Sequence, residues 1–414
     1  MRILYVSQFF PPESIAGAFR ADEHARRWSD LGHDVTVLTG WPNYPKGRVF
    51  DGCDVELLGE SSDRGVRVLR SKLVAKPNTS LIRRIANGAS FMFFGCLNVV
   101  FNGRKVGRDY DIVLASSGTV FAAYVGLLHS RLSHTPFVVE FRDITFEQMV
   151  ATGTPRDSWK VLLMRSLELH LAKSAAKVIV LTAGFKDKLA ECGVPAQKVE
   201  VVPNGADVVD VERIPDDGVV RLGYFGTMGI SQDVPTTLEI AEKIGELSGA
   251  PVRYDLVGEG AARADVEREL EGGRYPFAAL HHGVPKDELE ARYADCDLTF
   301  VSLQRSPAFE ATVPSKIFQS FARGVPVVFV GPEGEASRLV EKCGGGLTLC
   351  SDESENGRTL SAFFADDDWR SRLSEMGRRA QETMARDFSR AVLAERMLEV
   401  IEDASKAKGT AKDD

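Results

Sequence analysis

The stretch "FEATVPSKIFQSFARGVPVVFV", residues 309–330, reads as a polar loop, a short helix and a buried strand. Counted at 100° per residue, one side of the helix is apolar and consists of Ile317, Phe318, Phe321 and Ala322. The opposite arc is polar and consists of Lys316, Gln319, Ser320 and Arg323. Pro314 suits the first helical turn, because its missing N–H costs nothing there.

The N-terminus of this helix is suited to an anion. The free N–H groups of the first turn, the helix dipole and the Lys316 ammonium all favour negative charge at one place, most naturally a phosphate. The alternative is an amphipathic helix whose polar face only contacts water.

The same alternation of buried strand and amphipathic helix runs through the whole chain, which is typical of a doubly wound α/β fold. At 414 residues the chain exceeds the usual size of one hydrophobic core. We expect two Rossmann-like domains facing across a cleft, over 1–205 and 219–387, joined by a linker at 206–218. The N-terminal "MRILYVSQFF" is predicted to be the first strand, not a signal peptide.

Charge is divided unevenly along the chain. The net charge of −8 argues against general nucleic-acid binding, so no nucleic-acid partner is expected. Residues 1–210 hold 26 Lys/Arg against 22 Asp/Glu, which leaves 25 against 37 for the remainder. The six cysteines show no C-x-x-C pair and are expected to be reduced thiols in a cytoplasmic protein.

Two further glycine loops follow predicted strands. "YFGTMGISQDV" (224–234) contains Gly226 and Gly229, and "FFPPESIAGAFR" (9–20) contains Gly17. Glycine lets the backbone approach a ligand without a Cβ in the way. Each loop alone is common in α/β proteins, but together they place phosphate-binding loops in both predicted domains.

The chain resembles the retaining GT-B glycosyltransferases of family 4, in particular bacterial enzymes that build O-antigen, capsular or exopolysaccharide. The resemblance runs from residue 1 to about 405. It is carried by "FPPE" with Gly17, "LGHDVTVLTGWPNYPKG" (31–47), "EFRD" (140–143), "VLTAGFKDKL" (180–189), "VVPNGAD" (201–207), "YFGTMG" (224–229) and "PSKIFQSFARGVPVV" (314–328). The Trp-Pro-Asn-Tyr-Pro run and the Pro-Ser-Lys helix are the more specific pieces.

The resemblance implies transfer of a hexosyl or N-acetylhexosaminyl group from a nucleoside-diphosphate sugar, most simply a UDP-sugar, with retained configuration and without a metal or other cofactor. The N-terminal domain would hold a glycan or polyprenyl-diphosphate-linked acceptor, the C-terminal domain the donor, and a last helix at about 388–405 would pack back onto the N-terminal domain. The implied donor-binding residues are Gly17, Gly226, Thr227, Met228, Gly283, Val284, Val313, Pro314, Ser315, Lys316 and Gln319.

The chain departs from the family at several of these positions. The usual Glu-x7-Glu pair is replaced by Ala311 and Gln319, so Glu310 is our candidate for contacting the transferred sugar. The usual basic residue after the "YFG" strand is absent, which leaves more of the phosphate charge to Lys316. Where many relatives place a histidine near the reacting sugar, this chain has Arg142 and Asp143. We expect these two to contact donor or acceptor, and a structural ion pair is the alternative.

Residues 64–108 carry ten Lys/Arg and no acid, around the aromatic run Phe91–Phe94. Basic flanks beside an aromatic-rich helix suit peripheral docking on an anionic membrane, at about 1 kcal/mol per basic residue. A helix packed inside the N-terminal domain is the alternative, and the asparagines and glycines of 85–103 make a membrane span a poor interpretation.

Asp295 and Asp297 are spaced like a metal-binding pair, but they fall at a helix-to-strand junction and no metal is expected. Two other functions fit the same fold. A nucleotide-sugar 2-epimerase would convert the donor without any acceptor. A catalytically degenerate relative would only bind a nucleotide sugar, and the missing glutamate pair motivates that alternative.

Overall fold

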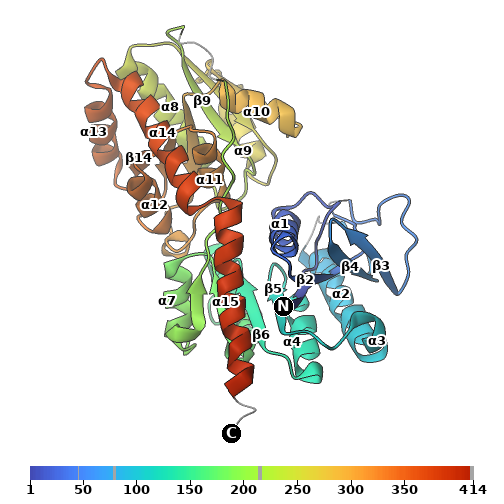
Figure 1. The fold of residues 1–414 in the computed structure, drawn as a ribbon. Helices are drawn as coiled ribbons and strands as arrows, with labels where there is room; N and C mark the ends of the chain where they lie inside the picture. Colours follow the sequence, from blue (N-terminus) through green and yellow to red (C-terminus); the bar gives the residue numbers. More distant parts are fainter. Residues whose placement is uncertain (45, 78–80, 213–216, 411–414) are drawn as a thin grey trace. The chain divides into compact units, whose positions relative to one another are not determined.

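Two units, each with its own sheet and core, make up the protein in the computed structural model, which describes residues 1–44, 46–77, 81–212 and 217–410 (Figure 1). Unit 1 comprises Met1–Gln148, Pro155–Pro203 and Arg390–Asp414, and unit 2 comprises Met149–Thr154 and Asn204–Ser389. The short segment Met149–Thr154 clusters with unit 2, although it lies inside the range predicted for the N-terminal domain.

Unit 1 is built on an eight-stranded sheet of order β3-β4-β2-β1-β5-β6-β7-β8, in which only the β3–β4 pair is antiparallel. Its strands are β1 (Arg2–Val6), β2 (Asp34–Gly40), β3 (Leu58–Asp63), β4 (Val66–Ser71), β5 (Ile112–Ser116), β6 (Phe137–Phe141), β7 (Lys177–Val180) and β8 (Val199–Val201). The inner strands β1, β5 and β6 are almost fully buried, as expected for parallel strands covered on both faces.

The helices of unit 1 are α1 (Ala16–Asp30), α2 (Leu81–Phe101), α3 (Gly103–Val106), α4 (Val120–Ser133), α5 (Thr145–Ala151, whose end lies in unit 2), α6 (Trp159–Ser174), α7 (Ala183–Glu191), the 3₁₀ turn η1 (Ala196–Lys198) and α15 (Arg390–Thr410). The last helix, α15, packs against α1, where Met397 and Ile401 join Trp28 in one core cluster. The indole N–H of Trp28 donates to the carbonyl of Ala394 at 2.8 Å.

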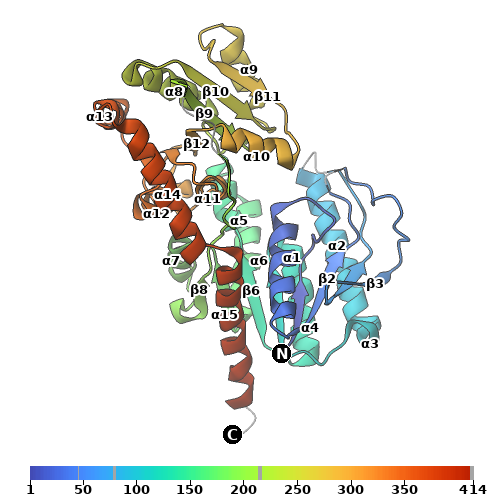
Figure 2. The same ribbon diagram turned by 45° about the horizontal axis from the view of Figure 1, so that its top comes forward.

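Helix α2 runs alongside α4 (Figure 2). A Cβ at Gly88 would lie 2.4 Å from the Phe121 ring, and one at Gly95 would lie 2.9 Å from Val125, so glycines permit this close packing. By length and composition alone α2 is long and apolar enough to cross a membrane, and one third of its most apolar window is buried in the protein.

Unit 2 contains a six-stranded parallel sheet of order β11-β10-β9-β12-β13-β14. Its elements in chain order are β9 (Val220–Phe225), α8 (Val234–Ser248), β10 (Val252–Val257), α9 (Arg263–Glu271), β11 (Ala278–His281), α10 (Lys286–Ala294), β12 (Leu298–Ser302), η2 (Pro307–Phe309), α11 (Ser315–Ala322), β13 (Val327–Val330), α12 (Glu335–Cys343), β14 (Gly346–Leu349), α13 (Glu353–Phe364) and α14 (Trp369–Asp387). The order reverses between β9 and β12, and ligands of such sheets bind beyond the carboxyl ends of the strands at that reversal.

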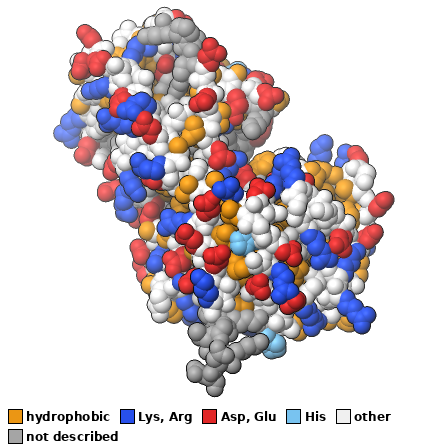
Figure 3. All heavy atoms as spheres, in the orientation of Figure 1, with side chains coloured by type: hydrophobic (Ala, Val, Ile, Leu, Met, Phe, Trp, Pro, Cys, Tyr) orange, Lys and Arg blue, Asp and Glu red, His pale blue; other side chains and the backbone are white. Residues whose placement is uncertain are grey.

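The six cysteines are all free thiols, as the sequence predicts for reduced residues. On the face drawn in Figure 3, acidic and basic side chains are interspersed and neither sign covers a whole unit. The uneven charge of the two halves of the chain is therefore not visible on this face as one uniform patch.

Candidate functional site

Helix α11 begins at Ser315, directly after Pro314, and buries the predicted apolar residues Ile317, Phe318 and Phe321. The predicted polar arc is only partly a surface. Ser320 is 1% exposed and its hydroxyl accepts a hydrogen bond from the Thr299 hydroxyl at 2.8 Å. The interpretation of a wholly water-facing polar side is therefore wrong, because polar partners on neighbouring elements cover part of that side.

Lys316 lies over the glycine turn that follows β9. Its ammonium donates to the carbonyl of Thr227 at 3.0 Å and lies 5.0 Å from the ring centroid of Tyr224. Burial lowers the pKa of Lys316 to about 8. Gly226 has φ +128°, and a Cβ there would lie 2.8 Å from Lys316 Cε. The structure thus brings Gly226, Thr227 and Lys316 together, and the turn depends on glycine both for its backbone angle and for space.

A second glycine loop packs on the first. A Cβ at Gly258 would lie 1.9 Å from the Gly226 carbonyl oxygen, and one at Gly260 would lie 2.2 Å from that of Met228. The backbone N–H of Met228 donates to Glu259 O at 2.8 Å. Met228 is fully buried in the core of unit 2, and its carbonyl accepts the Ala262 N–H at 2.9 Å, so the structure does not place this predicted residue on a ligand-facing surface. From its sequence alone, this second loop, "VGEG", reads as a turn and not as a binding site.

The loop that contains the predicted donor-binding residues Gly283 and Val284 is anchored to the same place. Glu259 Oε1 accepts hydrogen bonds from His282 Nδ1 at 2.7 Å and from the Gly283 N–H at 3.4 Å. Val284 packs against a small apolar cluster that includes Phe225. Four loops, after β9, β10 and β11 and before α11, therefore converge at the carboxyl edge of the sheet.

The remaining unit 2 candidates lie around the start of α11. Val313 and Pro314 are half-buried and Ser315 is exposed. The Glu310 side chain is exposed, while its carbonyl accepts the Glu335 N–H at 2.7 Å at the start of α12. This backbone contact fixes the loop, and the carboxylate itself stays accessible.

Gln319 is not an isolated surface amide. Its side-chain oxygen accepts a hydrogen bond from Arg323 NH1 at 3.0 Å, and Arg323 is buried against Glu290 of α10. The sequence placed Arg323 on the polar arc but gave it no partner.

In unit 1, the structure brings Gly17 and Arg142 together. A Cβ at Gly17, in the first turn of α1, would lie 2.6 Å from Arg142 NH1. The Nε of Arg142 is buried without a hydrogen-bond partner among the described residues. The Asp143 side chain is exposed to solvent on one side. Desolvation by the neighbouring protein atoms raises its pKa to about 6. No ion pair between Arg142 and Asp143 is found in the ranges that the structure describes, which disfavours a purely structural pair.

Buried carboxylates fix the "EFRD" segment, which begins with Glu140, and the turn that follows it. Glu140 is fully buried and its carboxylate accepts from Arg20 Nε of α1 at 2.6 Å, an ion pair that keeps its pKa low, at about 2, against desolvation. Glu168 of α6 accepts the N–H groups of Thr145 and Phe146 at 3.0 and 3.2 Å. Neither partner of the segment was predicted, since both are distant in sequence.

The "WPNY" segment is also held by buried polar groups. Glu13 Oε1 accepts the N–H groups of Asn43 and Tyr44, each at 2.9 Å. Asn87 of α2 donates to Asn43 Oδ1 at 2.8 Å and accepts from Gln8 Nε2 at 2.6 Å. The loops after β1 and β2 are therefore tied to α2.

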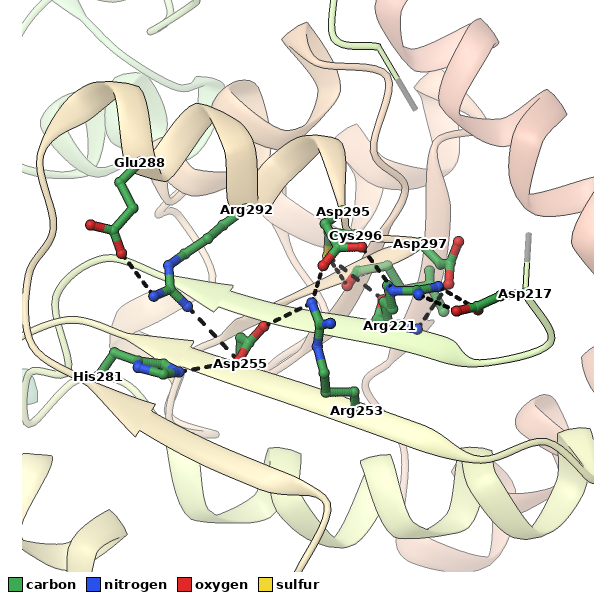
Figure 4. A network of polar contacts seen from close by, with 11 residues as sticks. Asp217, Arg221, Arg253, Asp255, His281, Glu288, Arg292, Asp295, Cys296 and Asp297 are labelled. Atoms are coloured by element: carbon green, nitrogen blue, oxygen red, sulfur yellow. Dashed lines mark hydrogen bonds and ion pairs between the residues drawn. The ribbon is translucent and has the colours of Figure 1, made fainter. Parts of the chain in front are cut away.

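Asp295 and Asp297 are engaged by arginine (Figure 4). Asp295 pairs with Arg221 Nε at 2.8 Å and also with Arg253, and Asp297 accepts the N–H of Arg221 at 2.8 Å. In the part of the chain that the structure describes, no three His, Cys, Asp or Glu side chains are grouped so that they could hold a metal ion.

The fold and the glycine-loop site at the carboxyl edge of unit 2 define a GT-B glycosyltransferase architecture. Solved structures share it over nearly the whole chain. Sucrose-phosphate synthase (tll1590) from Thermosynechococcus elongatus matches with a TM-score of 0.71 and 14% identity, covering 98% of this chain and 99% of that one. Anabaena Alr3699/HepE in complex with UDP-glucose matches with a TM-score of 0.62 and 17% identity, covering 97% and 100%.

Sequence comparisons found two similarities to glycosyltransferases. Residues 17–205 match the family model described as a Glycosyl transferase 4-like domain. WcaI of Escherichia coli (strain K12), named as a colanic acid biosynthesis glycosyl transferase, is 22% identical over 342 residues, or 78% of this chain and 82% of that protein. The predicted family resemblance, GT-B fold and enzyme class, a glycosyltransferase, are confirmed. The matches favour neither the 2-epimerase nor the degenerate relative.

Proposed function

We propose that the protein is a retaining glycosyltransferase that moves a sugar from a UDP-sugar to a glycan or lipid-linked acceptor in surface polysaccharide biosynthesis. The observation that carries the proposal is the position of Lys316 over the Gly226 turn, beside the free N–H groups at the start of α11. A UDP-glucose complex of a protein with the same fold supports the choice of donor, and the relation to WcaI supports the polysaccharide setting.

The chemistry explains why cations and N–H donors are needed there. The bond between the anomeric carbon and the diphosphate oxygen breaks, the acceptor hydroxyl oxygen forms the new bond to that carbon, and the hydroxyl proton passes to an oxygen of the departing diphosphate. Negative charge therefore grows on the departing diphosphate in the transition state. Preorganised donors and a cation stabilise that charge, and removing one such group typically costs about 10²–10³ in rate. Lys316 and the first turn of α11 would supply this stabilisation without a metal.

Unit 1 would contribute the acceptor side. The guanidinium of Arg142, with its buried Nε free of protein partners in the described ranges, lies against the first turn of α1 at Gly17. Such a group suits a phosphate or sugar hydroxyl oxygen, because arginine donates only. Asp143, with its raised pKa, would accept the hydrogen bond of a sugar hydroxyl.

Product analysis tests the proposal. The protein is incubated with candidate UDP- and GDP-sugars, with and without lipid-linked acceptors, and the product mass and anomeric configuration are measured. We expect an acceptor-dependent product with retained configuration, and a loss of about 10²-fold or more in Lys316→Ala. Arg338→Ala, at an exposed position of α12, is the matched control. Donor conversion without acceptor, or full activity of Lys316→Ala, would contradict the proposal.

We further propose peripheral membrane contact through α2 and its flanks. The exposed apolar side chains there include Ile82, Phe93 and Phe101, at 79%, 61% and 78% exposure. Arg84, Arg104 and Arg108 are exposed beside them. An apolar surface edged by basic residues suits an anionic lipid surface, where each basic residue contributes about 1 kcal/mol.

Two of the basic residues in 64–108 already have protein partners and are left out of the test. Arg67 is paired with Glu60, and Arg70 donates to the backbone carbonyls of Gly40 and Pro11. Co-sedimentation with phosphatidylglycerol vesicles should therefore fall when Phe93 becomes Ser and when Arg84 and Arg104 become Gln. Arg131→Gln, at an exposed position of α4, is the control. Binding that is absent in the unmodified protein, or unchanged in the variants, would overturn membrane contact and leave the transferase proposal intact.

A further inference from the structure

Arg323, just past the end of α11, joins two elements of the proposed donor site. Its side chain is 7% exposed. Nε donates to Glu290 Oε2 of α10 at 2.6 Å, NH2 donates to Glu290 Oε1, and NH1 donates to both the backbone carbonyl and Oε1 of Gln319, at 2.8 and 3.0 Å. The guanidinium also lies 4.6 Å from the ring centroid of Tyr293. A buried charge with this many partners is held in one orientation.

The two partners belong to different parts of the site. Gln319 follows Lys316 by one turn on α11, and Glu290 lies one turn into α10, the helix that starts after the Gly283–Val284 loop. A nucleoside diphosphate has its ribose between base and diphosphate. If the diphosphate lies at Lys316, as the proposed function has it, and the base lies at the Gly283–Val284 loop, the ribose lies beside Gln319. The inference below rests on that proposed function.

Arg323 determines which end of the Gln319 amide is available. A guanidinium only donates hydrogen bonds, so the atom that faces it must be the amide oxygen. The Nε2 group of Gln319 is then the end left over, and it has no protein partner within the described ranges. Gln319 therefore offers N–H donors, whereas a glutamate at this position would offer only acceptors.

We propose that Arg323 is a positioning residue of the donor site, which holds the Gln319 oxygen so that Nε2 donates to a ribose hydroxyl oxygen of the nucleotide. The pair of Gln319 and Arg323 then replaces a carboxylate that would accept from the same hydroxyl. Arg323 also ties the ribose position on α11 to the base loop through Glu290.

The contacts of α10 bear on this link between α11 and the base loop. Tyr293 is the only fully buried side chain among the described side chains of the helix. Leu289 is partly buried against the same apolar cluster as Tyr293, and Arg292 reaches Asp255 of β10 at 3.8 Å (Figure 4). Beside these contacts, the Arg323–Glu290 ion pair links α10 to the end of α11.

Calorimetry with UDP and 2′,3′-dideoxy-UDP tests the proposal on the full chain. The measured quantity is the ratio of the two Kd values, because general loosening of the site weakens both nucleotides alike and leaves the ratio unchanged. In the unmodified protein, loss of the hydroxyls should weaken binding about fivefold to tenfold, the usual worth of a hydrogen bond.

Two variants should abolish this discrimination. Gln319→Ala removes the donor, and Arg323→Lys keeps the charge but cannot hold Glu290 and Gln319 together. We expect a Kd ratio near one in both, whereas Arg338→Lys on the exposed face of α12 should keep the ratio of the unmodified protein.

The outcomes separate this inference from the proposed function. UDP binding with no discrimination in the unmodified protein, or undiminished discrimination in Arg323→Lys, would overturn the role of Arg323 alone. Absence of any UDP binding by the unmodified protein would overturn the donor site and this inference with it. Should Arg323→Lys not fold, Glu290→Gln leaves the Arg323–Gln319 contact in place, and a reduced UDP affinity with a preserved ratio is then the expected result. A lost ratio in Glu290→Gln would contradict the assignment.

Discussion

Lys316 is the residue on which the proposed donor site depends most. Its ammonium lies against Thr227 O and the Tyr224 ring, and burial holds its pKa at about 8, below the ordinary value of 10.5. A cation that is poorly solvated in the free protein gains more from an arriving diphosphate than one in water does. Lys316 should therefore make nucleotide affinity depend on pH near its own pKa of about 8, a lower pH than for an ordinary lysine.

We expect the affinity for UDP to fall as the pH rises through about 8. Because the pKa is lowered, the ammonium form is complete well below pH 8 and is lost above it, by up to about tenfold in affinity per pH unit. Kd measured by calorimetry from pH 6.5 to 9.5 gives the profile. Lys316→Arg stays charged over that range and should bind with a flat profile. Equal profiles for the two proteins would show that Lys316 does not carry the dependence.

At the same scale, the sequence predicted side chains better than their partners. Gly226 and Lys316 came from loop position and helix periodicity, both of which are local properties, whereas Thr227 came from the family resemblance. The structure brings the three together. Arg323 was seen as a polar residue, but its partner Glu290 is 33 positions away. Such pairings depend on which helices become neighbours, and periodicity within one element carries no information about that.

Helix α2 makes buried hydrogen bonds that its hydrophobic pattern does not predict. The sequence left open whether it docks on a membrane or packs in the domain, and the structure has it partly buried along α4 with other side chains exposed. Asn87 lies on the buried side, where its amide joins Gln8 and Asn43. Asparagine is a weak helix former, so its place in the helix is explained by these bonds.

We expect Asn87→Ala to lower the free energy of unfolding by about 2 kcal/mol or more, because Gln8 Nε2 and Asn43 Oδ1 lose a buried partner. Urea titration followed by circular dichroism measures this. The backbone amides of Trp41, Asn43 and Tyr44 should also exchange faster. Arg84→Ala, at an exposed position of the same helix, is the control and should cost less than half as much. An equal loss in both would mean that the buried network adds nothing.

At the scale of the whole molecule, the chain returns to its first unit at its end. The strand runs "RILYVS" and "DIVLASS" and the two-sheet organisation could be read from buried aliphatic runs, since parallel strands covered on both faces need them. That the last helix packs on α1 could not be read from its amphipathic pattern, because any apolar stripe would fit several faces. The resemblance alone suggested it, and in the structure Trp28, Met397 and Ile401 lie in one core cluster.

This connection makes unit 1 depend on residues far from its other elements in sequence. Ile401 is fully buried against the face of the sheet that contains Ile3 and Leu114. Ile401→Ala should cost about 2–5 kcal/mol through lost burial and the cavity left behind. Because the two units have separate sheets and cores, hydrogen exchange should quicken in β1 and β5 while β9 and β12 stay protected. Val392→Ala, at a position 38% exposed on the same helix, should change neither set. Equal loss of protection in β9 and β12 would instead show that both units unfold as one cooperative structure.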